Sequence, residues 1–230
     1  MRLFLRLAAA LLVTCPPAMA MTFQAAGTTL VMSGPVADGD LARLRDALAA
    51  GPIELVLLHD SSGGDLWNGL AVGEKIREEG LRTAVAGRCA SACALMFLGG
   101  ATRAFADVAG EPARLGLHGP HSRSTKQVTL RNAGRLSAYI ERMTGDKYPR
   151  DLLEKTVHIR HARDIIYMYH PGRLAAGHGK VTQCLVGDDD KRDCRALEGF
   201  DPLEAGVVTT LSLQEVPPAA KALLRSGPAP

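Results

Sequence analysis

The stretch Ile53–Asp65 reads IELVLLHDSSGGD and sets a buried strand directly before a glycine-rich loop. Its first half, Ile53–Leu58, is continuously apolar over the length of a strand, as expected for a parallel strand that is covered on both faces. The second half contains the pair Gly63-Gly64, and helical spacing of apolar residues resumes over Leu66–Glu79. A buried strand, a loop and a helix in this order predict an α/β fold.

The same order of elements extends to both sides of this stretch. We expect further strands over Thr28–Ser33, Leu81–Ala86, Arg114–Leu117 and Asp164–Tyr169, and helices over Asp40–Ala50, Ser91–Leu98, Val128–Thr144 and Pro149–Arg163. Two of the strand-to-helix loops would then lie at one edge of a parallel sheet, which is where open α/β sheets place their active sites.

Length and composition limit both the fold and the partners. The chain has 230 residues, of which 47% are hydrophobic, a balance that suits one domain or two small ones and excludes a wholly disordered chain. Aromatic residues make up only 4%, which argues against an antiparallel β sandwich. The formal net charge of +3 is not gathered in a basic block, so we expect no nucleic-acid partner.

Residues 1–20 have the three parts of a secretory signal peptide. Arg2 and Arg6 form a positive start, Leu7–Val13 an apolar centre, and Ala18–Ala20 a small-residue cleavage site. The apolar run is far shorter than the roughly 20 residues of a membrane-spanning helix, so we expect no stable membrane span after cleavage. The chain is therefore divided into a signal peptide over 1–20, an α/β domain over 21–210, and a loosely attached or disordered tail over 211–230. Export would place the protein in the periplasm or outside the cell.

Five cysteines are present, and Cys15 lies in the signal peptide. A lipid anchor on Cys15 is the less favoured alternative, because Thr14 is a poor residue before a lipidated cysteine. Cleavage leaves an even set of four cysteines, which can form disulfides in an exported chain. Cys184 and Cys194 bracket the polar, turn-forming sequence LVGDDDKRD, and we expect a disulfide that closes this hairpin.

The state of Cys89 and Cys93 stays open at the level of sequence. Four residues apart in a regular helix, they would have unfavourable disulfide geometry unless Cys89 lies before the helix. They could also be small buried hydrophobic residues. A metal-binding pair is less favoured because no second pair of matching spacing follows.

Three features could carry chemistry, although each has an ordinary structural explanation. Ser91 begins an apolar helix, where backbone N–H groups can stabilise an oxyanion, but serine is also a common helix cap. The pair Gly63-Gly64 can offer backbone N–H groups to an anion, but it also suits a simple turn. His118 follows a strand and could act as a general base beside Ser91, or serve only as a structural histidine.

The order of these features resembles the proteolytic subunit of the Clp protease and its relatives in the ClpP/crotonase fold. The resemblance spans roughly Leu30 to Lys180 and rests on Gly63-Gly64-Asp65, Gly87-x-x-x-Ser91, Leu115-Gly116-x-His118, Thr144-Gly145 and Arg163-Asp164-Ile165-Ile166-Tyr167-Met168. With its signal peptide and the sequence Cys-Ala-Ser-Ala-Cys, the chain looks most like exported ClpP-like proteins of Gram-negative bacteria. The resemblance implies stacked β-β-α units with a protruding handle helix over Val128–Thr144, and assembly of the chain into a homo-oligomer.

The resemblance also implies a Ser-His-Asp triad and an oxyanion hole. Ser91 matches the nucleophile, His118 the general base and Asp164 the orienting acid, with Asp151 as an alternative acid. The N–H groups of Gly64 or Gly63 and of Ala92 would hold the oxyanion. The chain departs from the family at Ser62, which replaces a proline, and at Cys93, which replaces a glycine.

Two His-x-x-His pairs could in principle bind zinc. They are His118 with His121 and His158 with His161. This spacing is a weak signal, and the second pair falls on a charged amphipathic segment. We therefore expect neither a metal site nor a cofactor.

These observations favour a periplasmic serine peptidase that cleaves peptides or unfolded proteins through an acyl-enzyme intermediate. A catalytically inactive relative that binds peptides or proteins in the cell envelope is the first alternative. Crotonase-type chemistry on acyl-CoA thioesters is less favoured, because these esters are cytoplasmic. A serine-lysine dyad is a variant that the position of His118 makes less attractive.

Overall fold

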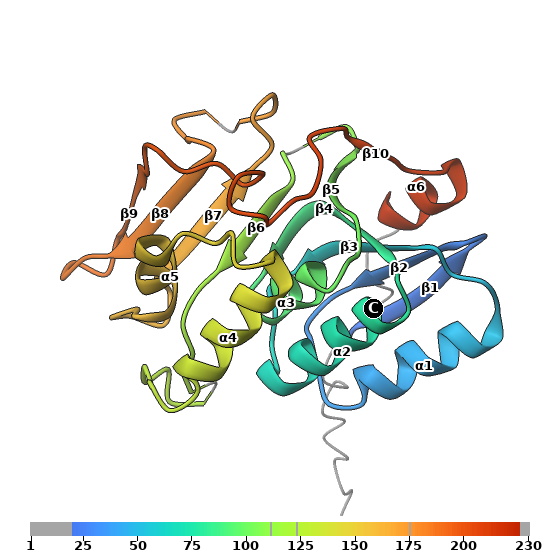
Figure 1. The fold of residues 1–230 in the computed structure, drawn as a ribbon, viewed down its shortest axis with the longest axis horizontal. Coiled ribbons are helices and arrows are strands. Elements are labelled where there is room, and N and C mark those ends of the chain that lie inside the picture. The colour runs from blue at the N-terminus through green and yellow to red at the C-terminus, as the bar shows by residue number, and fades with distance from the viewer. Residues whose placement is uncertain (1–19, 111, 123, 175, 226–230) are drawn as a thin grey trace, which may run out of the picture.

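The computed structural model describes residues 20–110, 112–122, 124–174 and 176–225. Over these residues the chain is a mixed α/β protein with a ten-stranded mixed sheet and six helices (Figure 1). The strands are β1 (Thr22–Ala26), β2 (Thr29–Ser33), β3 (Leu55–Ser61), β4 (Arg82–Ala90), β5 (Arg103–Asp107), β6 (Arg114–Leu117), β7 (Ile165–Tyr169), β8 (Val181–Val186), β9 (Arg192–Ala196) and β10 (Gln214–Glu215). The helices are α1 (Asp40–Ala50), α2 (Leu66–Glu78), α3 (Ala92–Leu98), α4 (Ala133–Thr144), α5 (Arg150–Val157) and α6 (Pro218–Arg225).

The sheet has a parallel centre and antiparallel edges. Its main path runs β1-β2-β3-β4-β6-β7-β8-β9, and the pairs from β2 to β6 along this path are parallel. Strand β4 changes partner along its length: Thr83–Val85 pair with β5, whereas Arg88–Ala90 pair with β6. Gly87, with a φ of 67°, lies between these two sections. The sheet therefore forks at the point where β4 leads toward Ser91.

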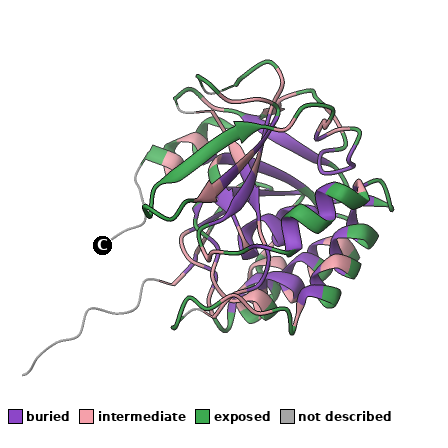
Figure 2. Ribbon diagram, turned by 90° about the vertical axis from the view of Figure 1, so that its left-hand side faces the viewer, coloured by how far each residue is buried: buried purple, intermediate pink, exposed green. Residues whose placement is uncertain are grey.

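The central strands are covered on both faces, as the apolar run in β3 predicts. Val56 and Leu58 belong to the larger hydrophobic cluster, which includes residues of α1, α2 and α3, whereas Leu55 and Leu57 belong to a smaller cluster. Figure 2 shows the buried strands inside the layers of helices, with exposed residues on the outer helical faces. Burial on both faces explains why this strand is continuously apolar instead of alternating.

Close packing of α2 on α3 fixes the start of α3. A side chain at Gly69 would meet Ala92, and a side chain at Gly73 would meet the carbonyl oxygen of Leu95 and the hydroxyl of Tyr139. The Tyr139 hydroxyl in turn donates a hydrogen bond of 2.8 Å to the Leu95 carbonyl. The two glycines let the helices approach each other, and this approach positions the turn that precedes α3.

The expected handle helix does not protrude. Helix α4 begins at Ala133 instead of Val128, and its apolar face, which includes Leu136, Tyr139 and Ile140, is buried in the larger cluster. Figure 1 shows α4 lying against the body of the molecule beside α3. The amphipathic pattern is satisfied within the chain, so it is not a sign of a projecting element.

The structure adds two strands that the sequence did not predict, and it bears on two other sequence predictions. The strands β1 and β5 were not expected, because TFQAA and RAFAD are short and lack a clear alternation. The hairpin of β8 and β9 is closed by a disulfide between Cys184 and Cys194, with their Cα atoms 4.0 Å apart, as we predicted. The predicted signal peptide over 1–20 lies outside the described residues except for Ala20.

The described part of the C-terminal segment is attached more closely than the expected tail over 211–230. Strand β10 pairs with β5, and Val216 and Ala220 are buried in the smaller cluster. Helix α6 carries Leu223 and Leu224 against the same cluster, so it covers sheet surface that other helices leave open. No helix in the described ranges combines the length and apolar character that crossing a membrane requires.

Candidate active site

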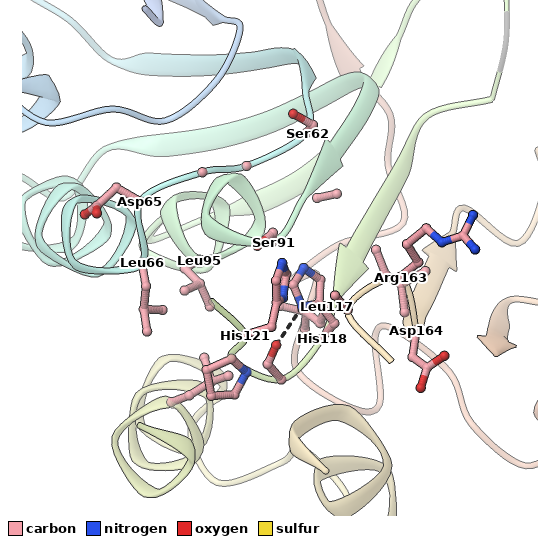
Figure 3. A pocket seen from close by; sticks show the side chains of 18 of the residues that line it. Ser62, Asp65, Leu66, Ser91, Leu95, Leu117, His118, His121, Arg163 and Asp164 are labelled. Atoms are coloured by element: carbon pink, nitrogen blue, oxygen red, sulfur yellow. Dashed lines mark hydrogen bonds between the residues drawn. The ribbon is translucent and has the colours of Figure 1, made fainter. Parts of the chain in front are cut away.

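A cleft of about 550 Å³ lies at the carboxyl edge of the central strands. Five of the six residues proposed for catalysis line it: Gly63, Gly64, Ser91, His118 and Asp164. Figure 3 shows Ser91 and His118 facing the same space, Ser91 from the turn before α3 and His118 from the residue after β6. The fold therefore brings together residues that are far apart in the sequence.

Ser91 occupies a strained turn between β4 and α3. Its φ is 57° and its ψ is −128°, a conformation that non-glycine residues rarely adopt. Its N–H donates a 2.8 Å hydrogen bond to the Gly116 carbonyl, which ties the turn to β6. The Ser91 side chain makes no capping hydrogen bond to α3. The Ser91 side chain therefore does not serve as a helix cap, and Ser91 lies on a sharp turn between a strand and a helix.

The glycine loop after β3 packs directly against this turn. Gly63 has a φ of 86°, and a side chain there would overlap the Ala90 carbonyl and the Ser91 Cβ atom. The Gly63 N–H donates to Ser61 Oγ at 3.2 Å, so it is not available to an oxyanion. The N–H groups of Gly64 and Ala92 make no hydrogen bond within the part of the chain that the structure describes. These two groups remain the candidate oxyanion donors.

His118 is held in the tautomer that a general base needs. Its Nδ1 lies 2.7 Å from the Gly119 carbonyl oxygen, which can only accept a hydrogen bond, so Nδ1 carries the proton (dashed line in Figure 3). The other ring nitrogen, Nε2, is then an acceptor. Burial lowers the pKa of His118 to about 4, so the imidazole is neutral at pH 7. A neutral imidazole with a free Nε2 can accept the proton of a serine.

No hydrogen bond joins Ser91 to His118 among the described residues. Both side chains nevertheless line the same cleft. Such catalytic contacts are often long before a substrate is bound and shorten in the complex. The arrangement is therefore compatible with proton transfer from Ser91 to His118.

Asp164 lines the cleft but does not orient His118. Its Oδ2 atom accepts from the backbone N–H groups of Arg160 and His161 at 3.0 and 2.9 Å, and its Oδ1 atom accepts from the Val186 N–H at 2.9 Å. Figure 3 shows the carboxylate pointing away from the His118 ring. The cause is local: α5 ends at Val157, and the chain that follows forms a turn around Asp164 in place of the expected helix.

The alternative acid, Asp151, is no closer to this role. It lies in the first turn of α5, is exposed, and is not part of the cleft lining. The atom that holds His118 Nδ1 is the carbonyl oxygen of Gly119, the next residue in the chain. Sequence comparison by motif could not find this acceptor, because every residue has a backbone carbonyl.

His121 is a site residue whose role the sequence did not predict. Its ring centroid lies 5.1 Å from that of His118, and it lines the same cleft. Its Nδ1 atom is buried without a hydrogen-bond partner in the described structure. The spacing His-x-x-His drew attention to both residues, but the described residues contain no group of three or more ligands placed to hold a metal ion.

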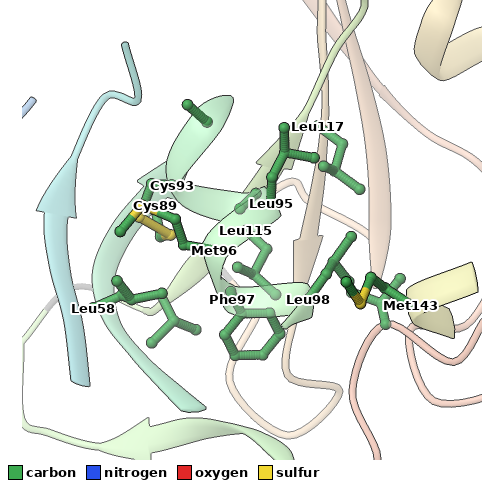
Figure 4. Close-up of a cluster of buried hydrophobic side chains, with 14 of the residues drawn as sticks. Leu58, Cys89, Cys93, Leu95, Met96, Phe97, Leu98, Leu115, Leu117 and Met143 are labelled. Carbon is green, nitrogen blue, oxygen red and sulfur yellow. A yellow bond between two sulfur atoms is a disulfide. The ribbon is translucent and has the colours of Figure 1, made fainter. Parts of the chain in front are cut away.

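The second disulfide joins the two elements that carry Ser91. Cys89 is in β4 and Cys93 is in α3, with their Cα atoms 5.3 Å apart. Both cysteines are fully buried next to Met96 and Leu115 in the larger cluster (Figure 4). Because Cys89 precedes the helix, the objection to a disulfide within one regular helix does not apply. This bond fixes the ends of the turn around Ser91.

Comparison with known proteins adds no assignment: no protein-family model matches the chain, and no curated protein matches it significantly.

Proposed function

We propose that this protein is a serine peptidase of ClpP-like fold that cleaves peptides or unfolded proteins through an acyl-enzyme intermediate. The observation that carries the proposal is the strained, non-capping Ser91 in the same cleft as a neutral His118 with a free Nε2. A strained backbone at a serine that caps nothing suggests a functional role. The order of sequence motifs supports the finer assignment to the ClpP/crotonase fold, and the parallel strands β2, β3, β4 and β6 are compatible with it.

In the proposed first step, His118 Nε2 takes the Ser91 proton while Ser91 Oγ forms a bond to the substrate carbonyl carbon. The negative charge moves to the carbonyl oxygen, where the N–H groups of Gly64 and Ala92 stabilise it. The C–N bond then breaks, and His118 returns its proton to the leaving amine. This leaves an acyl-serine ester.

Hydrolysis of the ester completes the cycle. His118 takes a proton from water, the resulting hydroxide attacks the acyl carbon, and Ser91 recovers its proton as the ester bond breaks. The Gly119 carbonyl keeps the His118 ring in one tautomer throughout. Asp164 acts through its charge, which raises the pKa of His118 and so favours the imidazolium formed in each step. No cofactor is required.

A binding module without activity is the second candidate. The position of Asp164 favours it, because a triad normally places the carboxylate on His Nδ1. In that case the same cleft would hold a peptide without attack on its carbonyl.

A fluorophosphonate probe distinguishes these candidates, because it reacts covalently only with an activated serine. We expect the wild-type protein to be labelled and the Ser91→Ala variant to remain unlabelled. Ser62→Ala is the matched control, because Ser62 is an exposed serine on the wall of the same cleft. Absence of labelling in a folded wild-type sample would favour the binding module.

Location in the periplasm and assembly into a homo-oligomer are also proposals. Two disulfides support an oxidising compartment. Assembly rests on the family resemblance alone, because the apolar face of α4 is used within the chain. A mass of one chain by light scattering would contradict assembly.

A further inference from the structure

Some of the charged side chains that line the cleft have an ion-pair partner and others do not. Four cationic side chains line it, and they come from four separate segments: Arg88 in β4, Lys126 before α4, Arg163 before β7, and Arg192 at the start of β9. Arg163 forms an ion pair with Asp190. The side chains of the other three make no ion pair or hydrogen bond within the described ranges, and all three residues are exposed.

The acidic groups of the cleft do not neutralise these cations. Asp65 caps α2, where its Oδ1 atom accepts from the Asn68 N–H at 2.8 Å. Asp164 is only 2% exposed and accepts three backbone N–H groups. Near Arg88, the Asp60 carboxylate accepts the Arg88 backbone N–H and contacts His59, so it does not pair with the Arg88 guanidinium.

The cleft also has an apolar lining. Leu95 and Leu117 form part of this lining near Ser91, as Figure 3 shows, and Leu136 of α4 also lines the cleft. Trp67, which is 45% exposed, adds an aromatic surface. A ligand that fits this lining would combine apolar side chains with negative charges.

We propose that the cleft selects peptides that carry carboxylate groups, recognised by Arg88 and Arg192 and assisted by Lys126. This inference rests on the proposed function, since it assumes that the peptide passes Ser91. An arginine can hold a carboxylate through two parallel N–H donors, so it suits this role better than the single ammonium group of a lysine. The carboxylate could come from an acidic side chain or from a chain terminus.

Binding to the Ser91→Ala variant tests the inference without depending on catalysis. Fluorescence anisotropy compares four labelled peptides of one length: glutamate-rich with an amidated end, glutamine-matched with an amidated end, glutamine-matched with a free carboxylate, and lysine-rich. We expect the glutamate-rich peptide to bind most tightly if side chains are recognised, and the free-acid peptide if the terminus is recognised. Equal binding of all four peptides, or no binding, overturns the inference.

Arginine variants locate the effect. Arg88→Gln and Arg192→Gln, each combined with Ser91→Ala, are expected to weaken binding of the acidic peptide by roughly two- to fivefold, as for exposed ion pairs. Arg45→Gln is the matched control, because Arg45 is an exposed arginine of α1 outside the cleft. Binding should also weaken as salt is raised, since a Debye length of about 10 Å at 0.1 M screens exposed charges.

Two further outcomes are informative. A single-stranded oligonucleotide of equal charge that binds as tightly as the acidic peptide overturns peptide selection in favour of a general polyanion surface. Probe labelling of the wild type separates this inference from the proposed function. Preferred binding of the acidic peptide without probe labelling supports the inference and contradicts the proposed peptidase. Probe labelling without any preference for the acidic peptide supports the peptidase and overturns the inference.

Discussion

At the level of single residues, a variant of Asp164 tests whether the site works as a Ser-His-Asp triad or as a serine-histidine pair. In Asp164→Asn, one carboxylate oxygen becomes an NH₂ donor, so a backbone N–H at Arg160, His161 or Val186 loses its acceptor. We expect a stability loss of about 1–3 kcal/mol, the cost of an unsatisfied buried polar group. The rate of probe labelling should fall by far less than the roughly 10⁴-fold that follows loss of an orienting aspartate.

Urea unfolding measures the loss of stability, and the rate of probe labelling measures the effect on Ser91, in one set of samples. Asp151→Asn is the control, because Asp151 is an exposed carboxylate outside the cleft. A labelling loss near 10⁴-fold with unchanged stability would mean that Asp164 moves onto His118 during the reaction.

The pKa of His118 predicts a pH profile unlike that of an ordinary histidine. Burial lowers this pKa to about 4 from an ordinary value of 6.5. The His118 imidazole therefore stays neutral in the folded protein at pH 5, and labelling at pH 5 should remain close to the rate at pH 7.5. Stability behaves differently: between about pH 6.5 and 4 the unfolded chain binds the extra proton, so stability falls as the pH drops through this range.

The measurement follows labelling in buffers between pH 4 and 8, with circular dichroism to confirm that the protein is folded at each pH. His121→Gln is informative as a companion variant, because a positive charge on His121 lowers the pKa of His118. A labelling midpoint near pH 6.5 in the wild type would show that His118 is solvated or is not the base.

Sequence could predict that Ser91 and His118 lie at one site, but not their hydrogen bonds. Ser91 and His118 stand out because each sits where a strand ends, and the fold brings both ends to one cleft. The partners of Asp164 depend on a turn that follows α5, and helical periodicity gave no sign of that turn. The acceptor for His118 is a backbone carbonyl, which no residue pattern can identify.

At the level of elements, the two disulfides have different expected effects. Cys89–Cys93 joins β4 to α3 around Ser91, whereas Cys184–Cys194 joins β8 to β9. Loop entropy alone gives each bond a contribution of about 2–3 kcal/mol. We expect the double variant Cys89→Ala, Cys93→Ala to slow labelling markedly, because the strained Ser91 turn can then relax.

The double variant Cys184→Ala, Cys194→Ala is the matched control, with a comparable loss of stability and little change in labelling. Thermal unfolding under identical buffer conditions provides the stability comparison. Equal labelling rates in the two double variants, measured well below both melting temperatures, would show that the Cys89–Cys93 bond has no special role in holding Ser91.

Sequence predicted best the elements whose bounds depend on residues close together in the chain. Helix α1 and strand β6 have the expected bounds, and α2 differs by one residue. Strand β4 runs on past its expected end at Ala86 because it gains a second partner, β6, beyond Gly87. Such an extension depends on a strand more than twenty residues away in sequence, so local spacing could not predict it.

For the whole molecule, the sheet must be covered on both faces, and this requirement explains the positions of α4 and α6. The pattern of α4 correctly indicated an apolar face, but only the three-dimensional packing shows that α3 and the larger cluster cover it. Likewise, residues after Leu213 are short of strong sequence signals, yet they complete the smaller cluster. Amphipathic segments thus predict burial reliably, but they do not identify the surface that buries them.

The C-terminal segment is therefore expected to contribute to global stability and not to the chemistry. A chain that ends at Leu213 would lose β10 and α6, and would expose Leu55 and Leu57 together with Ala84 and Ala86. Because complete burial of one aliphatic side chain contributes about 1.5–3 kcal/mol, we expect the truncation to cost several kcal/mol and to lower the melting temperature clearly. Since neither β10 nor α6 lines the cleft that contains Ser91, the truncated protein that remains folded at low temperature should still react with the probe.

The point variant Val216→Ala tests the contribution of the same segment to stability with a smaller change, because Val216 is 1% exposed and lies between β10 and α6. It should lower stability by about 1 kcal/mol or more through the lost methyl groups, without affecting the labelling rate. Lys221→Ala in α6 is the control, because Lys221 lies outside the apolar cluster. If the truncated chain unfolded at the same temperature as the full chain, then α6 would be only loosely attached, as the sequence alone suggested, and the smaller cluster would need another cover.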